Sequence, residues 1–364
     1  MRKKILIISA SMVHRTPHVQ MYMNMLEKMG VLYDVVVWNR KGDVVADLPK
    51  NCILYNKPTD DLYPFWKKII ENWRFSRSIK NKLDIYEYSA AIVVDIATAV
   101  FFSLLLFNHF AKRYIFDIRD YSPFCKYAIT RKLISKLITC SFQTVISSAG
   151  FKSWLPPKRD DFVISHNIDY DTLVSLDQSS FSPLSDKIIK ILTIGNLRDP
   201  DAHKEVIRAF GSNVFFQLCF VGDGLAAPIL MDFCSQHQVS NAKFIGHYEK
   251  KDEIGFYKNA DIVNCCMEDN MLSNYLMSNR IYLAALTHKP IICFRGSYQS
   301  KIIEDYGIGL AINRNEDMLA CTKQYLLTFD RDKYEKNRVM FLDLVKEEYK
   351  NFFNTLTKLS QINS

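Results

Sequence analysis

A guanidinium at the start of a helix is the first feature of this chain that could do chemistry. Residues 260–265 are mostly apolar and predict a buried strand of a parallel sheet, and a polar loop, 266–278, leads into a helix. The segment 288–290 ends that helix, because its proline cannot continue it. Asn279 and Arg280 lie at the helix start, where α/β sheets bind phosphorylated ligands. We therefore expect Arg280 to face an anion.

A carboxylate at the end of a predicted strand is the corresponding feature of the first half. Residues 90–94 read as a buried strand, and Asp95 follows directly. Because burying a charge is costly, Asp95 is a candidate for a catalytic role. A second interpretation is that Asp95 caps a helix beginning near Ala97. Arg119, between Asp117 and Asp120, fits either a structural ion-pair network or a contact with a phosphate.

The loop after the first predicted strand also carries polar side chains. Residues 3–9 read as that strand, the loop 10–17 contains His14 and Arg15, and His18 begins the next helix. The loop contains no glycine, which argues against a simple dinucleotide site at this position.

Strand and helix patterns alternate along both halves of the chain. Parallel-type strands are expected at 3–9, 33–38, 90–94, 114–117 and 144–147, and again at 188–195, 215–221, 242–245, 260–265 and 291–294. This alternation predicts an α/β fold of two Rossmann-like domains. A serine-rich stretch without periodicity, 175–185, reads as a linker, so we place the domains at 1–180 and 186–339.

Size and composition agree with this division and narrow the class of protein. The 364 residues suit two domains of roughly 170 residues each. Nine cysteines lie scattered without CxxC spacing, which argues against a metal site and favours a reducing cytoplasm. No secretory signal is expected, since residues 5–10 are too short for one. The longest apolar run, 90–107, contains Asp95 and divides into a strand and a helix, so we expect no membrane span.

The net positive charge lies entirely in the first half. Residues 1–180 hold 25 lysines and arginines against 17 acidic residues, whereas residues 181–364 hold 22 of each. Much of the excess lies on two amphipathic segments, 64–83 and 126–138, whose basic faces carry Lys67, Lys68, Arg74, Arg77, Lys80, Lys82, Lys126, Arg131, Lys132 and Lys136. In the segment 64–83 we expect Phe65, Ile69, Ile79 and either Ile70 or Trp73 to point inward. The basic faces are either solvated or dock on an anionic membrane or a polyanionic ligand. Nucleic acid is not expected, because interleaved aromatic residues are lacking.

Several segments resemble GT-B glycosyltransferases, in particular family 4 members of bacterial polysaccharide clusters. They are YIFDIRDYSP (114–123), TVISSAGFKSWLP (144–156), FVGDG (220–224) and NRIYLAALTHKPII (279–292). The resemblance extends from Lys3 to about Asn313. It implies two Rossmann-like domains that face each other across a cleft, with a last helix, about 340–364, that packs back on the first. It also implies a nucleotide-sugar donor and a reaction without metal or other cofactor.

The resemblance assigns roles to individual positions. Asn196 and Asp201 occupy the columns where the family has an arginine and a lysine against the donor diphosphate, so Arg198, His203 or Lys204 would supply the missing cation. The family's two signature glutamates fall on Leu283 and near Tyr275, and its glycine falls on His288; Leu283→Glu should therefore improve donor affinity. The implied catalytic residues are Asp95 and Arg280. The implied donor-binding residues are Asn196, Arg198, Lys204, Gly222, Asp223, Gly224, Gly246, His247, Tyr248, Asn279, Arg280 and Ser297, and the acceptor-side residues are His14, Arg15, His18 and Arg119.

Together these features predict a glycosyltransferase that moves a sugar from a nucleotide-sugar to a lipid-linked or saccharide acceptor in capsule or O-antigen synthesis. We expect it in the cytoplasm, at the inner face of the membrane if the basic half binds lipid. The alternative is a non-catalytic subunit or scaffold of a polysaccharide assembly complex, suggested by the missing glutamates and cations. A nucleotide-sugar epimerase of the same fold is a third reading.

Overall fold

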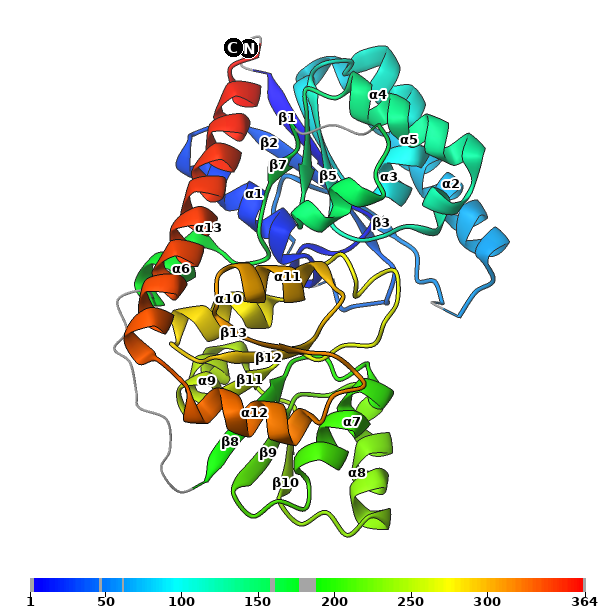
Figure 1. Cartoon of the computed structure of the whole chain (residues 1–364). Helices are drawn as coiled ribbons and strands as arrows, with labels where there is room; N and C mark the ends of the chain where they lie inside the picture. Colours follow the sequence, from blue (N-terminus) through cyan, green and yellow to red (C-terminus); the bar gives the residue numbers. More distant parts are fainter. Residues whose placement is uncertain (1–2, 46–47, 61, 158–160, 177–187, 363–364) are drawn as a thin grey trace. The chain divides into compact units, whose positions relative to one another are not determined.

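The computed structural model describes residues 3–45, 48–60, 62–157, 161–176 and 188–362 (Figure 1). The chain divides into two compact units: residues 1–167 together with 348–364 form unit 1, and residues 168–347 form unit 2. The sequence placed this division between 180 and 186. The linker expected at 175–185 lies outside the described residues except for 175 and 176.

Unit 1 is built on a seven-stranded parallel sheet in the order β3-β2-β1-β4-β5-β6-β7. Its strands are β1 (Lys4–Ile8), β2 (Tyr33–Asn39), β3 (Cys52–Asn56), β4 (Tyr88–Val94), β5 (Tyr114–Ile118), β6 (Gln143–Ile146) and β7 (Val163–Ile164). β1, β2, β4 and β5 are almost entirely buried, as continuous apolar runs in a parallel sheet require.

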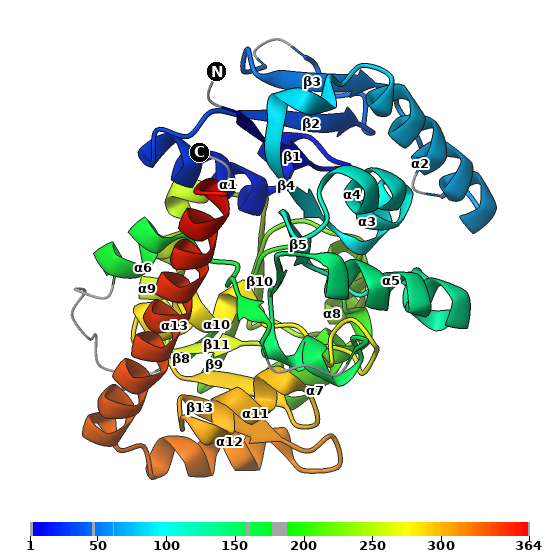
Figure 2. The ribbon, with the colours of Figure 1, turned by 90° about the horizontal axis from the view of Figure 1, so that it is seen from above.

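Helices cover both faces of this sheet (Figures 1 and 2). The helices are α1 (Pro17–Lys28), α2 (Phe65–Lys80), α3 (Ile96–Phe101), α4 (Ser103–His109), α5 (Ala128–Cys140) and the end of α13 (Arg331–Ser360). α1 and the last turns of α13 share one apolar core with β1, β2 and β4. On the other face Trp38 of β2 stacks on Phe75 of α2, which in turn contacts Phe102. The sheet of unit 1 is thus packed between two layers of helices, which fix the loops at its carboxyl edge.

Unit 2 is built on a six-stranded parallel sheet in the order β10-β9-β8-β11-β12-β13. Its strands are β8 (Ile189–Ile194), β9 (Phe216–Val221), β10 (Ala242–Gly246), β11 (Ile262–Asn264), β12 (Ile291–Phe294) and β13 (Gly309–Ile312). Its helices are α6 (Tyr170–Leu176), α7 (Pro200–Phe210), α8 (Ala226–Gln236), α9 (Glu253–Lys258), α10 (Asn279–Leu286), α11 (Tyr298–Asp305), α12 (Met318–Leu327) and most of α13. In both sheets the first strand lies at the point where the strand order reverses, and loops leaving the carboxyl ends of such strands form ligand sites. The predicted α/β class with two Rossmann-like domains is confirmed.

The inward face of α2 differs from the expected one. The helix buries Glu71, Asn72, Phe75, Ser76 and Ile79, whereas Phe65, Ile70 and Trp73 are exposed. Only Ile79 of the expected inward residues is fully buried. The reason is an ion pair from outside the helix: the Glu71 carboxylate turns inward and pairs with Lys57 at 2.7 Å, and also with Arg74 at 2.7 Å. The exposed face of α2 is therefore aromatic as well as basic.

Candidate functional site

Two glycines bring the loops after β8 and β9 together at the carboxyl edge of the sheet in unit 2. A Cβ atom on Gly222 would lie 2.1 Å from the carbonyl oxygen of Gly195, and Gly222 has a φ of +115°, so a larger residue is excluded. The Gly222 amide donates to the Gly246 carbonyl at 2.8 Å, and the Leu197 amide donates to the Asp223 carbonyl at 2.9 Å. The segments around Asn196, Gly222–Gly224 and Gly246 therefore form one continuous surface.

Arg280 lies next to this surface, at the start of α10. Ser278 caps the helix by accepting from the Arg280 amide, and Arg280 as a residue is only 8% exposed. Its Nη1 donates to the carbonyl oxygen of Asn264, at the end of β11, over 3.3 Å. Asn264 is itself fixed, since its side chain donates to Thr193 at 2.8 Å and accepts from the Cys266 amide at 2.9 Å. No carboxylate of the described residues lies within ion-pair distance of Arg280, although the charge of Arg280 acts on Asp199 from farther away.

The groups around Arg280 respond to its charge. The pKa of His203, on α7, is lowered to about 3 by burial and by Arg280, so the imidazole is neutral at physiological pH. Neither ring nitrogen of His203 has a hydrogen-bond partner among the described residues. The pKa of Asp199 is raised by burial and by the nearby carboxylate of Glu268, against the opposing effects of Arg198 and Arg280. Arg198 thus shares the neighbourhood of Asp199 with Arg280.

Lys204, the other expected cation, points elsewhere. Its Nζ forms an ion pair with Asp201 at 3.2 Å and lies 5.9 Å from the ring centroid of Phe233 on α8. It therefore lies on the outer flank of α7, beside α8. Of the cations proposed to replace the family's missing pair, Arg198 is the better placed.

The segment expected to read the base follows β10. His247 is highly exposed and lies 3.3 Å from the carboxylate of Asp223. Tyr248 is half-buried, and its hydroxyl donates to Glu253 at 3.1 Å. Burial and the carboxylate of Glu253 raise the pKa of Tyr248 to about 12, with Arg280 acting in the opposite direction. Tyr248 is thus a neutral, fixed ring in the electrostatic neighbourhood of Arg280.

The backbone amides around Ser297 already donate hydrogen bonds to other groups of the protein. Ser297 caps α11 in a capping box with Ser300, whose hydroxyl accepts from the amides of Gly296 and Ser297. The Tyr298 amide donates to the Asn274 carbonyl at 2.7 Å. These groups are consequently poorly available to a phosphate, which makes Ser297 a weaker donor-binding candidate than Arg280. Asn279, beside Arg280, keeps a buried side-chain oxygen that has no hydrogen-bond partner within the described part of the chain.

A cavity of about 110 Å³ in unit 2 adds residues that the sequence did not single out. Besides Ser297, which the sequence had already proposed, it is lined by Glu268, Gln299 and Arg314, among others. Gln299 is buried and donates to the Cys265 carbonyl at 3.1 Å, while its side-chain oxygen has no described partner. Glu268 also accepts from the Asp201 amide at 3.2 Å. Glu268 lies three residues after the predicted strand 260–265. This position in a loop at the carboxyl end of a strand is the sequence signal that could have identified it as a site residue.

The candidate residues of unit 1 fall into two groups. His14 and Arg15 both pair with Asp43, at 3.1 Å and 2.5 Å, and Arg15 lines a cavity of about 190 Å³ together with Arg40 and Lys41. His18 instead lies near Arg119: burial of the imidazole, and secondarily the charge of Arg119, lowers the pKa of His18 to about 3. The buried Nε2 of His18 has no described hydrogen-bond partner.

Arg119 is a structural residue as well as a neighbour of His18. Its guanidinium donates to Asp117 at 2.7 and 2.9 Å, and to the carbonyl and hydroxyl oxygens of Ser165 at 2.9 and 3.1 Å. The pair is buried, and it ties β5 to the segment that follows β7. A role as a fixed positive charge fits this geometry better than a direct, mobile contact with a ligand.

Asp95 has a strained backbone conformation. It follows β4 with φ 70° and ψ 147°, a conformation that non-glycine residues rarely adopt and that costs of order 1–3 kcal/mol. Its side chain does not cap α3, so the capping interpretation is wrong. Although the residue keeps some exposed surface, burial of the carboxyl group raises its pKa to about 7, assisted by Asp120 and Asp117 and opposed by Arg119. A strained, buried carboxyl with such a pKa is suited to proton transfer near neutral pH.

Among the described residues there is no cluster of three histidine, cysteine or acidic side chains that could hold a metal ion. The nine cysteines are all unpaired, and burial raises the pKa of Cys265 to about 12. Within the described ranges, every helix is too short or too polar to cross a bilayer.

Comparison with known proteins gives structural relatives only. No family model and no curated protein sequence matches the chain. Sucrose-phosphate synthase from Thermosynechococcus elongatus superposes with a TM-score of 0.69 at 12% identity, covering 99% of this chain and 98% of that one. HepE of Anabaena, solved in complex with UDP, gives 0.66 at 10% identity, covering 98% and 100%. The lipopolysaccharide outer core galactosyltransferase WaaB gives 0.64 at 13% identity, covering 98% and 99%. The chain has the GT-B fold.

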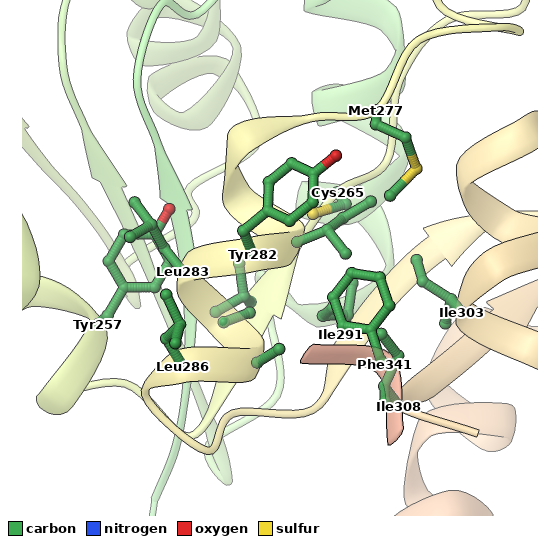
Figure 3. Close-up of a cluster of buried hydrophobic side chains, with 14 of the residues drawn as sticks. Tyr257, Cys265, Met277, Tyr282, Leu283, Leu286, Ile291, Ile303, Ile308 and Phe341 are labelled. Atoms are coloured by element: carbon green, nitrogen blue, oxygen red, sulfur yellow. The ribbon is translucent and has the colours of Figure 1, made fainter. Parts of the chain in front are cut away.

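The position that aligns with a GT-B signature glutamate belongs to the core in this chain. Leu283, on α10, is 2% exposed and lies among the apolar side chains of unit 2, near Tyr257 and Leu286 (Figure 3). A glutamate at this position would be buried in an apolar environment. The expectation that Leu283→Glu improves donor affinity therefore no longer follows.

His288 keeps the backbone shape of the glycine that it replaces. Its φ is +60°, and its Nδ1 lies 2.9 Å from the carboxylate of Glu335 on α13. The imidazole therefore holds α13 to the end of α10, a role that glycine could not fill. Both departures from the GT-B pattern have a packing role in this chain.

Proposed function

We propose that the protein is a glycosyltransferase that transfers a sugar from a nucleotide-sugar donor to a hydroxyl group of an acceptor. Unit 2 binds the donor with its diphosphate at Arg280, and unit 1 supplies Asp95 to the acceptor. The observation that carries the proposal is the buried Arg280 guanidinium, which has no described carboxylate partner and lies at the carboxyl edge of a parallel sheet. The GT-B fold and the UDP bound to one structural relative support the choice of donor.

Arg280 has the properties that a leaving nucleoside diphosphate requires. As the bond between the sugar and the diphosphate breaks, negative charge grows on the phosphate oxygens, and a fixed cation in a dry site stabilises that charge. A guanidinium held by a backbone carbonyl is already oriented, so little reorganisation is needed. Arg198 is exposed and close to Asp199, so it adds a second positive charge at the rim. The neutral His203 adds no further charge.

Asp95 supplies the complementary proton chemistry. The acceptor hydroxyl must lose its proton as its oxygen bonds to the sugar carbon, and the Asp95 carboxylate accepts that proton. With a pKa near 7, Asp95 is a stronger base than an ordinary carboxylate and is still largely ionised slightly above neutral pH. His18 and the fixed Arg119 lie close enough to each other to shape the acceptor surface electrostatically.

Isothermal calorimetry with UDP, GDP, CDP and dTDP tests the donor half of the proposal. One of these should bind, and Arg280→Ala should weaken that binding by about 1.5–3 kcal/mol, the contribution of hydrogen bonds to a charged group. Arg295→Ala is the matched control, because Arg295 follows the neighbouring strand but is exposed and paired with Glu304 at 2.7 Å. Unchanged affinity in folded Arg280→Ala, or equal losses in both variants, would move the diphosphate away from Arg280.

A non-catalytic GT-B subunit is the second candidate, favoured by the burial of Leu283 in the core and by Asn196 and Asp201 at the cation positions. Such a subunit would bind a nucleotide without turning a donor over. Release of nucleoside diphosphate from the donor whose nucleotide binds, measured with and without acceptor, separates the two. Turnover that disappears in Asp95→Asn, while nucleotide affinity is kept, supports the enzyme.

The finer features rest on the sequence resemblance alone. We propose a lipid-linked or saccharide acceptor of surface polysaccharide synthesis, and a reaction that needs no metal. Dialysis against EDTA should therefore leave the transfer rate unchanged. A loss of rate that Mg²⁺ or Mn²⁺ restores would contradict metal independence without affecting the role of Arg280.

A further inference from the structure

Unit 1 exposes an aromatic and apolar surface along α2. Trp66 is 62% exposed and Trp73 is 50% exposed, and Phe65 and Ile70 beside them are also on the surface. Exposed tryptophans grouped on one helix are unusual on a soluble surface and mark a place of contact. The burial of Glu71 and Asn72 on the opposite side of the helix holds this face outward.

Neighbouring helices continue the apolar surface. Phe65 contacts Tyr127, at the start of α5, with ring centroids 6.3 Å apart. Ile129 on α5 is 83% exposed, and Leu104 on α4 is 67% exposed. A shallow cavity of about 350 Å³ lies between α2 and the α3–α4 segment, and its lining includes Trp73 and Leu104. The contact of Phe65 with Tyr127 and the cavity shared by Trp73 and Leu104 thus connect the apolar side chains of α2 with those of the neighbouring helices.

The charge of this surface has a single sign. Helices α2, α3, α4 and α5 contain eight lysines and arginines and one acidic residue, Glu71, which is buried and already paired. Several cations lie over the aromatic rings: the Lys67 Nζ is 3.5 Å from the centroid of Tyr63, and the Arg77 guanidinium is 5.2 Å from that of Trp73. Aromatic rings beside long cationic side chains are the composition of an interfacial helix.

We propose that this surface binds an anionic phospholipid bilayer, with α2 lying in the plane of the headgroups. Trp66, Trp73, Leu104 and Ile129 would enter the boundary between headgroups and acyl chains, while the lysines and arginines contact lipid phosphates. The near absence of acidic residues favours a polyanionic surface over a protein partner of mixed charge. The inference is independent of the proposed glycosyl transfer, because it uses no residue of either candidate site.

Co-sedimentation with vesicles tests the proposal directly. The protein should pellet with phosphatidylcholine vesicles that contain 30% phosphatidylglycerol (roughly the anionic content at which polybasic segments bind), not with pure phosphatidylcholine, and binding should fall with added salt. Lys67→Ser combined with Lys132→Ser should weaken the partition coefficient about thirtyfold, since each surface cation contributes about one factor of five. Lys250→Ser with Lys251→Ser in unit 2 removes the same charge and should leave binding unchanged.

Tryptophan fluorescence supplies a test of the insertion. All four tryptophans lie in unit 1, and Trp38 and Trp154 are buried, so brominated anionic lipids should quench Trp66 and Trp73 selectively. Trp66→Ala with Trp73→Ala should remove the quenching and weaken binding at least tenfold. Phe215→Ala, a change at a 61% exposed residue of unit 2, is the control. Equal binding to neutral vesicles, no binding to either kind, or self-association without vesicle binding would overturn the proposal.

Discussion

Replacing Asp95 by asparagine should stabilise unit 1 at alkaline pH while it abolishes proton transfer. Asparagine tolerates the positive φ of this position about as well as aspartate does, so the backbone is retained. The carboxyl, in contrast, is unfavourable when ionised: its pKa is raised from 3.8 to about 7. A carboxyl whose pKa is higher in the folded state binds more protons there, so the wild-type protein loses stability as pH rises from about 4 to about 7.

The size of the effect follows from that shift. At about 1.4 kcal/mol per pH unit, ionisation of Asp95 lowers the free energy of unfolding by about 4 kcal/mol at pH 8. Asparagine does not titrate, so the variant should match the wild type near pH 4 and exceed it progressively up to pH 7. Urea unfolding followed by tryptophan fluorescence measures this, because all four tryptophans report on unit 1.

Asp120→Asn provides the comparison, since Asp120 is exposed and raises the pKa of Asp95 through space. It should change stability by less than about 1 kcal/mol at any pH. The reasoning fails if Asp95→Asn is less stable than the wild type at pH 8. It also fails if the difference between Asp95→Asn and the wild type does not depend on pH.

Three further predictions concern the chemistry and the core. If the Asp95 carboxylate is the base, kcat/KM should fall about tenfold per pH unit below about pH 7, and a midpoint near 4 in the pH–rate profile would contradict this. Arg280→Met should leave the apo protein as stable as the wild type or more so, because a buried, unpaired charge is removed, yet nucleotide should no longer raise its Tm. Leu283→Glu should destabilise unit 2 by about 3 kcal/mol or more, measured by urea denaturation. If the variant instead binds nucleotide more tightly, the donor is bound as the GT-B resemblance implies and this prediction is wrong.

The strands and the fold class could be predicted because parallel strands leave a strong local signal. Continuous apolar runs such as 291–294 were found at their observed bounds, and the glycines at 222 and 224 marked the turn after β9 correctly. The helix at Asn279 was equally readable, from the loop before it and the proline after it. These features depend on residues close in sequence.

What failed depended on partners distant in sequence. The inward face of α2 was misjudged because aromatic residues were expected to be core, whereas Glu71 turns inward to meet Lys57 from outside the helix. Tertiary contacts also explain why His14 and Arg15 pair with Asp43. The ion pair with Asp201 likewise directs Lys204 away from Arg280. The strain at Asp95 carries no sequence signal, because aspartate both caps helices and tolerates unusual backbone angles.

Helix α13 affects the order in which the two units can fold during synthesis at the ribosome. Its first half contributes Tyr334, Phe341 and Val345 to the core of unit 2, and its last turns contribute Phe352 and Leu356 to the core of unit 1. Domains usually fold from the amino end as they are synthesised. Here unit 1, although its strands are made first, lacks part of its core until residues 352–359 emerge, so unit 2 can close before unit 1 does. Until then the apolar face of β1, β2 and β4 that receives α13 lacks its cover, and a nascent chain truncated before Phe352 would present that face to chaperones.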